Sequence, residues 1–263
     1  MTHSVAGHFG EWIQGRLGPS GPVCLVTVAC PAHCVQATRL GDGPLAVDDP
    51  DAVLNPGAVA GFLAQVGGRT GRYRLRATMP PGGGAGASTA ALVALARAAS
   101  GQEPTLVTAC IATEGASDPL MLSQPDRVIW ASREGRSLGS LPVLPRSEIV
   151  GGFWGGAVRT DPADSDFADV SDLVDRLRRP VDLPELAALA TQSAQRCSAL
   201  RGPKDDPTAD LANALGALGY LRAHTGSARG LIFAPGTVPG DAMARLGAAG
   251  FRQPVQFLTG GAA

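Results

Sequence analysis

A glycine-rich segment between an expected strand and an expected helix is the part of this sequence best suited to chemistry. Five small residues, 82–86, allow positive φ angles and close approach of a ligand to the backbone. Ser88 and Thr89 then open an Ala/Leu/Val stretch, 90–99, with high helix propensity. The first N–H groups of a helix lack an intrahelical partner, and the helix dipole favours an anion there. The segment therefore indicates either a phosphate site, in which Ser88 can also reach a metal ion, or an ordinary connection with a Ser/Thr cap.

The elements that must position this segment predict an α+β fold. Alternating or β-branched runs indicate strands, and longer runs without Gly or Pro indicate helices. The expected strands are 23–29, 35–40, 73–78, 127–130, 148–150, 231–233 and 255–258. The expected helices are 90–99, 106–113, 172–178, 183–200, 209–222 and 242–249. Because prolines punctuate 141–145, we predict a boundary there, between an N-terminal lobe, 1–145, and a C-terminal lobe, 146–263.

Composition excludes several classes of protein. The 263 residues carry 22 Lys+Arg against 23 Asp+Glu, a net charge of −1, which argues against an electrostatically driven nucleic-acid binder. No apolar run approaches a membrane span, and the first residues do not form a signal peptide, so we expect a cytoplasmic protein without a membrane partner. Lys204 is the only lysine and follows no suitable glycine pattern, which excludes a Walker-type phosphate loop.

The cysteines do not indicate a metal or disulfide framework. Their number, five, is odd, no C-x-x-C occurs, and a chain of this size needs no disulfide, so we expect reduced thiols. The segment 30–34 reads Cys-Pro-Ala-His-Cys and invites a zinc interpretation. A closed zinc site needs four ligands, and no second Cys/His pair has suitable spacing. We therefore expect no metal there.

Three segments, in order along the chain, resemble the GHMP kinase superfamily. Residues 7–15, GHFGEWIQG, are similar to the G-x-x-G-E-L-L-Q-G segment of its L-threonine kinases of cobalamin biosynthesis and propanediol utilization. Residues 80–90, PPGGGAGASTA, are similar to the superfamily loop P-x-x-x-G-L-G-S-S-x-A. Residues 223–233, AHTGSARGLIF, are similar to A-H-S-G-T-x-x-G-L-L-F of the threonine kinases.

The resemblance implies a two-lobed α+β kinase that transfers the γ-phosphoryl group of MgATP to a hydroxyl of a small amino acid or amino alcohol, with L-threonine as lead candidate. Asp118, in a segment that resembles E-P-T-D, would be the catalytic residue, although Ser-Asp-Pro is also a common turn. Ser88 and Glu114 would hold magnesium. The ATP-binding residues would be Pro81, Gly82, Gly83, Gly84, Ala85, Gly86, Ala87, Ser88 and Thr89. The substrate-binding residues would be Glu11, His224, Thr225, Gly226 and Ser227, where Gly226 can also be a simple helix terminator.

The glycine loop departs from the family pattern at three positions. Where the threonine kinases have K-G-M-A-S-S-T-A-D, this chain has Gly83 for Lys, Ala87 for the first Ser and Ala91 for Asp. Loss of the lysine removes a positive charge from the phosphates, and an arginine from elsewhere in the chain could substitute for it. These departures motivate an alternative, a nucleotide- or metabolite-binding protein that keeps the fold without turnover. A dinucleotide site ranks last, because the loop lacks G-x-G-x-x-G and the following acidic residue.

Overall fold

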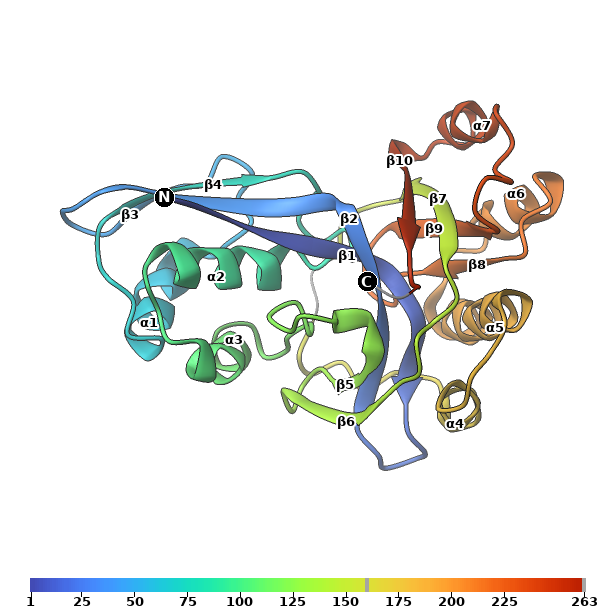
Figure 1. Cartoon of the computed structure of the whole chain (residues 1–263), viewed down its shortest axis with the longest axis horizontal. Helices are drawn as coiled ribbons and strands as arrows, with labels where there is room; N and C mark the ends of the chain where they lie inside the picture. The colour runs from blue at the N-terminus through green and yellow to red at the C-terminus, as the bar shows by residue number, and fades with distance from the viewer. Residues whose placement is uncertain (159–160, 262–263) are drawn as a thin grey trace.

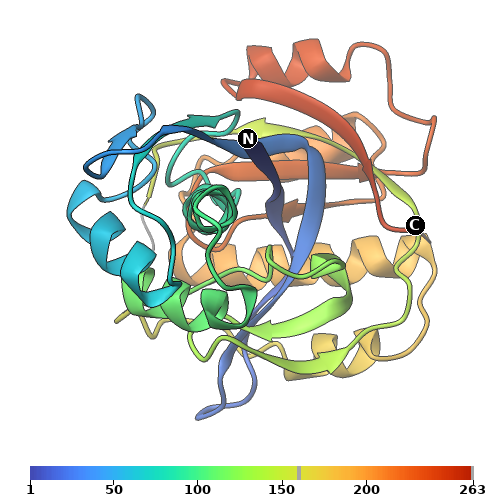
Figure 2. The same cartoon turned by 60° about the vertical axis from the view of Figure 1, so that its left-hand side comes forward.

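A computed structural model of the chain describes residues 1–158 and 161–261. The described residues form one mixed sheet of ten strands with seven α-helices around it, as Figure 1 and Figure 2 show. The strands are β1 (Thr2–Arg16), β2 (Val23–Gly41), β3 (Ala46–Asp48), β4 (Arg72–Ala77), β5 (Val128–Ala131), β6 (Arg136–Ser140), β7 (Ser147–Phe153), β8 (Gly219–Arg222), β9 (Ala228–Phe233) and β10 (Arg252–Thr259). The helices are α1 (Pro56–Gln65), α2 (Ala87–Ala98), α3 (Leu106–Glu114), α4 (Ser171–Leu177), α5 (Leu183–Arg201), α6 (Thr208–Ala214) and α7 (Ala242–Ala248), with 3-10 turns at Glu103–Thr105 and Pro125–Arg127.

Two long strands, β1 and β2, run through both lobes of the molecule. The strand order is β10-β7-β9-β8-β1-β2-β4-β3, and β5 joins through β2 and pairs with β6. In Figure 1, α1, α2 and α3 lie with β3 and β4 at one end of these strands, and α5 to α7 lie with β7 to β10 at the other. The predicted two-lobed α+β class is confirmed. The division of the chain near residue 145 stays a prediction.

The predicted pair of strands 23–29 and 35–40 is wrong, because both belong to the single strand β2. Its antiparallel partner is β1, which our sequence analysis did not predict as a strand. The ladder passes from Gly7 opposite Cys30 to Ala6 opposite Cys34, so 31–33 bulge out of it. Pro31 lies in this bulge, where its missing N–H costs no ladder hydrogen bond. The proline therefore marks an irregularity inside a strand and not its end.

The predicted helix 209–222 is also wrong over its second half. Helix α6 ends at Ala214, Gly216 follows with φ +67°, and 219–222 pair with β9 as strand β8. The left-handed glycine stops the helix, and pairing with β9 then favours the extended form over the intrinsic preference of the Leu-rich stretch. The other predicted strands and helices are confirmed, with shifts at their ends. None of the described helices is long and apolar enough to cross a membrane.

Helix α2 is the centre of the core and runs out of the glycine loop. All its residues but Ser88 and Arg97 are buried, and it packs against β1, β2 and β4. Figure 2 looks nearly along this helix, with strands on one side and helices on the other. Its many alanines let the helix approach the sheet closely, since each adds little side-chain volume. The start of α2 is thereby held in one place relative to β1.

Backbone hydrogen bonds clamp the glycine loop between β1 and the β8–β9 hairpin. The N–H groups of His8 and Gly10 donate to the carbonyls of Ala85 and Gly84, each at 3.1 Å. The N–H groups of Ser227 and Ala228 donate to Gly83 O at 2.9 and 2.7 Å. The carbonyl groups of Gly83, Gly84 and Ala85 therefore accept hydrogen bonds from backbone N–H groups of the protein.

This close packing predicts that Gly84 tolerates no side chain. Its φ is +74°, and a Cβ would lie 2.2 Å from Ala223 Cβ and 2.6 Å from Thr225 O. We expect Gly84→Ala to lower the free energy of unfolding by about 2–5 kcal/mol, from backbone strain and overpacking together. Urea denaturation measures it. The control is Gly236→Ala, with φ +79° but no atom within 4 Å, which should lose only about 1–2 kcal/mol. Equal losses would contradict the packing argument.

Candidate active site

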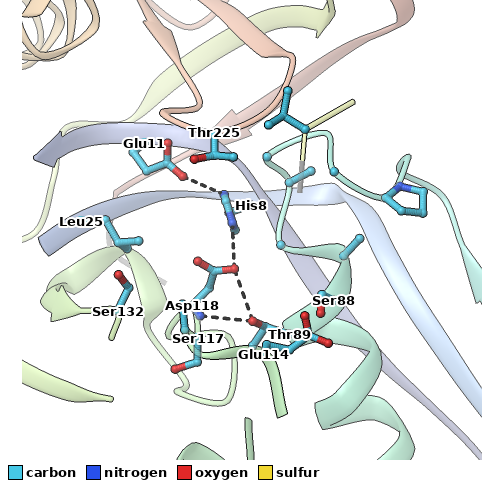
Figure 3. Close-up of a pocket in the computed structure, with 18 of the residues that line it drawn as sticks. His8, Glu11, Leu25, Ser88, Thr89, Glu114, Ser117, Asp118, Ser132 and Thr225 are labelled. Carbon is cyan, nitrogen blue, oxygen red and sulfur yellow. Dashed lines mark hydrogen bonds and ion pairs between the residues drawn. The ribbon is translucent and has the colours of Figure 1, made fainter. Parts of the chain in front are cut away.

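A cavity of about 320 Å³ opens where the glycine loop, the start of α2, strand β1 and the α3–β5 connection meet (Figure 3). It gathers most of the residues predicted for phosphate, metal, catalytic and substrate roles. Those that line it are Glu11, Pro81, Gly82, Gly84, Ala85, Gly86, Ala87, Ser88, Thr89, Glu114, Asp118 and Thr225. The predicted residues outside its lining are Gly83, His224, Gly226 and Ser227.

One end of the cavity is formed by the N-terminus of α2. Helix α2 begins at Ala87, and its N-cap is Gly86, with φ 72° and no side-chain cap. The cap interpretation of Ser88 and Thr89 is therefore wrong, because both lie inside the first turn. The bond from Ala90 N–H to Gly86 O is 2.9 Å long, so the N–H groups of 87–89 precede the helical ladder. Their free donors and the helix dipole favour an anion at this end.

Ser88 and Glu114 are the residues fitted to hold a magnesium ion. Both line the cavity, and the buried Ser88 Oγ has no hydrogen-bond partner among the described residues. Oxygen donors are the ligands that magnesium prefers, and it is commonly held by one or two protein oxygens together with substrate phosphates. No cluster of three or more His, Cys, Asp or Glu side chains able to bind a metal occurs in 1–158 or 161–261. The donor set therefore fits magnesium that arrives with a nucleotide.

His8 joins Asp118 and Glu11 in a row of charged side chains along the cavity. Its Nε2 lies 3.3 Å from Asp118 Oδ2, and its Nδ1 lies 3.7 Å from Glu11 Oε1. Thr89 Oγ1 donates to the same Asp118 oxygen at 3.4 Å and accepts from the Asp118 N–H at 3.2 Å. Figure 3 shows this row running from Glu11 through His8 to Asp118 and Thr89. The row links the start of α2 with the end of the cavity that Glu11 lines.

Burial and mutual charge set the protonation of this row. Burial by itself lowers the pKa of His8, but the carboxylates of Asp118 and Glu11 outweigh it and raise that pKa to about 9. Burial raises the pKa of Glu11 to about 7, against the opposing effect of the His8 charge. His8 is therefore a cation at neutral pH, and Glu11 titrates close to neutrality.

Our sequence analysis did not single out His8 and did not predict β1, in which a regular strand would place His8 and Glu11 on opposite faces. On β1, His8 pairs with Ala29 and Glu11 pairs with Thr27, so β1 has one residue more than β2 between these pairs. Gly10, with φ +65°, lies in this bulge, and a Cβ there would be 2.9 Å from Arg222 C. The bulge turns both side chains to the cavity. The only signal in the sequence is the Gly at 10 between the two residues.

The segment 224–227 is the turn of the β8–β9 hairpin and not a helix end as predicted. Of its residues only Thr225 lines the cavity, while Gly226 and Ser227 pack on the glycine loop through their backbones. The N–H of His224 lies 3.3 Å from Glu11 Oε2 and 3.2 Å from Gln14 Oε1. The hairpin thus supports the glycine loop and Glu11, and the helix-terminator interpretation of Gly226 is wrong.

Two further residues of the cavity, Arg133 and Phe167, carry no signal in the sequence. The Arg133 guanidinium lies 5.3 Å from the centre of the Phe167 ring and donates to the carbonyl of Asp161 at 3.3 Å. Among the lining residues that the structure describes, Arg133 is the single Lys or Arg. Phe167 lies beyond the acidic run 161–166, which is most simply a turn, and reaches the cavity through tertiary contacts alone.

Comparison with solved structures identifies the fold. The phosphomevalonate kinase of Streptococcus pneumoniae matches with a TM-score of 0.69 and 12% identity, over 98% of this chain and 99% of that chain. The homoserine kinase of Cytophaga hutchinsonii matches with a TM-score of 0.52 and 15% identity, over 98% and 94%. The chain has the GHMP kinase fold. The mevalonate pyrophosphate decarboxylase of Streptococcus pyogenes also matches, with a TM-score of 0.58 and 10% identity over 100% and 97%, so this fold also occurs in a decarboxylase. No family model and no curated protein sequence matches the chain.

The environment of His224 in this GHMP fold predicts acid sensitivity. Its ring stacks on Phe167 with centroids 4.0 Å apart, and neither ring nitrogen has a hydrogen-bond partner among the described residues. Burial, then the charge of Arg201, lowers the pKa of His224 to about 3. Because the folded pKa lies below the unfolded value, the contribution to stability is complete above pH 6.5 and is lost as pH falls toward 3.

We expect the free energy of unfolding to include a term from His224 that falls by up to about 1.4 kcal/mol per pH unit below pH 6.5. His224→Phe keeps the aromatic stack without a titrating group, so it should remove this term. Urea denaturation at pH 7 and pH 5 measures it, with His3→Gln at the outer end of β1 as control. An unchanged pH dependence in His224→Phe would contradict the assignment.

Proposed function

We propose that this protein is an ATP-dependent small-molecule kinase that phosphorylates a hydroxyl group. The observation that carries the proposal is one cavity in which a free helix N-terminus faces a row of carboxylates. The loop and the start of α2 supply backbone donors for a triphosphate, and Asp118 lies at the same cavity, 23% exposed. Phosphoryl transfer asks mainly for positioning and for donors toward developing charge. This cavity holds both a carboxylate that can position an acceptor and backbone donors that can face the developing charge.

The residues divide the reaction between them. The N–H groups of 87–89 and the small residues 82–86 bind the phosphates, and Ser88 and Glu114 would hold a magnesium ion, which would neutralise negative charge on the phosphates. Asp118 accepts the hydrogen bond of the acceptor hydroxyl and takes up its proton. The bond from the γ-phosphorus to ADP breaks as a bond from that phosphorus to the acceptor oxygen forms.

The acceptor end fits a small amino acid, and L-threonine is the lead substrate. Glu11 and the Gln14 amide can bind an ammonium group, since a charge-assisted hydrogen bond to a carboxylate is strong. Arg133 offers a planar cation for a carboxylate at the same cavity. The neighbour whose name gives an amino-acid acceptor, homoserine kinase, supports this class. The choice of threonine rests on the resemblance of 7–15 and 223–233 to the threonine kinases.

The first test is turnover and its dependence on Asp118. We expect MgATP-dependent phosphorylation of at least one of threonine, serine, homoserine and ethanolamine. Asp118→Asn should lower kcat by about 10²–10⁴-fold, because it removes the group that takes the proton, while ATP affinity stays within a few-fold. Kinetic assays with calorimetric ATP titration measure both. ATP binding without turnover of any acceptor would favour the alternative, a nucleotide-binding protein.

The second test concerns the charge of the acceptor. Arg133→Gln should raise KM for an amino acid by about 10–100-fold, the loss of one charged hydrogen bond. KM for ethanolamine, which has no carboxylate, and KM for ATP should not change. Arg136→Gln is the matched control, because Arg136 is exposed and pairs with Glu134. A rise in KM for ATP instead would place Arg133 on the phosphates and contradict the acceptor assignment.

A further inference from the structure

His8 lies between the glycine loop, which is proposed to bind the phosphates, and Asp118, which is proposed to bind the acceptor. The residue is 2% exposed, and its N–H donates to Ala85 O in the glycine loop at 3.1 Å. A Cβ on Gly86 would lie 2.5 Å from His8 Cδ2 and 2.9 Å from Nε2, so the ring packs directly against the cap of α2. The same ring then reaches Asp118 in the α3–β5 connection. One side chain therefore contacts both the phosphate loop and the acceptor carboxylate.

Both ring nitrogens of His8 face acceptors. Nε2 lies 3.3 Å from Asp118 Oδ2, while Nδ1 lies 3.3 Å from Gly10 O and 3.7 Å from Glu11 Oε1. A neutral imidazole has one N–H and one lone pair, and that lone pair would then face an oxygen. Only the imidazolium donates on both sides. The geometry therefore calls for a charged His8.

The contacts of Asp118 show how the charged His8 side chain acts on the Asp118 carboxylate. Its Oδ2 faces two donors, His8 Nε2 in an ion pair at 3.3 Å and Thr89 Oγ1 in a hydrogen bond at 3.4 Å, whereas no described residue bonds Oδ1. Figure 3 shows this second oxygen directed away from the His8–Thr89 contacts. Two donors on one oxygen fix the rotation of a carboxylate, which leaves the other oxygen for a ligand.

We propose that His8 is a positioning residue. As an imidazolium between Glu11 and Asp118, it aims Asp118 Oδ1 at the acceptor hydroxyl and holds Asp118 beside the glycine loop. This inference rests on the proposed kinase function. In this arrangement His8 acts on the reaction through Asp118. It sets the distance between the acceptor oxygen and the phosphate cradle, to which the rate of a transfer reaction is very sensitive.

The groups that face His8 determine its dependence on pH. Glu11 lies on its own strand, and Asp118 lies on the α3–β5 connection. Helix α2 contributes the Thr89 hydroxyl through Asp118, the glycine loop contributes backbone, and Arg222 of β8 acts on Glu11. With the two carboxylates dominant over burial, the pKa of His8 is raised to about 9. Positioning should therefore hold at neutral pH and fail as pH rises through about 9.

The experiment compares His8→Gln with His8→Lys. His8→Gln keeps hydrogen-bonding atoms without the charge, so we expect kcat to fall by about 10–100-fold, with KM for ATP nearly unchanged and no loss of activity near pH 9. His8→Lys restores a cation, so it should recover much of kcat and move the alkaline loss to higher pH. The control is His33→Gln, which changes another buried histidine of the β1–β2 pair, outside the cavity, and should leave kcat and the pH profile as in the wild type.

A kcat of His8→Gln within twofold of the wild type, or an alkaline limb that persists in it, overturns the proposal. NMR titration of ring-labelled histidine separates this failure from failure of the kinase function, because it needs no turnover. The His8 resonance, assigned by its loss in His8→Lys, should report an imidazolium up to about pH 9 and titrate at lower pH in Asp118→Asn. A neutral His8 at pH 7 in the wild type overturns the proposal even if the enzyme is active.

Discussion

The backbone hydrogen bonds between β1 and the glycine loop are the constraint on which the rest of the site depends. His8 and Gly10 donate to the carbonyls of Ala85 and Gly84, and the hairpin turn donates to Gly83. These bonds occupy the carbonyl side of the loop, so the donors at the start of α2 remain for a ligand. The same contacts put the side chains of β1 beside the helix terminus. One set of bonds thus builds both the anion site and the row of charged residues next to it.

Strand irregularity is the second device that the fold uses. In a regular strand, side chains three positions apart point to opposite faces. Glu11 would therefore point into the core if His8 pointed to the cavity. The bulge at Gly10 inserts one residue, and the positive φ of that glycine allows it. The resulting burial of His8 and Glu11, beside the partly exposed Asp118, is costly unless their charges compensate one another. Their spacing of 3.3 and 3.7 Å provides that compensation.

The fold alone does not choose the reaction, because kinases and a decarboxylase share it. The choice comes from side chains at the two ends of the cavity. The proposed phosphate end is almost without side chains, so in the proposed function backbone N–H groups stand in for the loop lysine of related sequences. The acceptor end is rich in charge, with Glu11 on one side and Arg133 near Phe167.

The sequence by itself determined the elements whose signals are local. The run of glycines before an Ala-rich stretch predicts a loop with positive φ angles and a helix after it, because backbone freedom and helix propensity are properties of the residues themselves. The resemblance of short motifs to the GHMP kinases pointed to Glu11 and Asp118, which the structure places at one cavity. Only the tertiary structure decided that His8 joins them, that 219–222 is a strand, and that Arg133 and Phe167 reach the cavity. A bulge, a strand pairing and a contact between distant loops depend on partners elsewhere in the chain, so no local pattern encodes them.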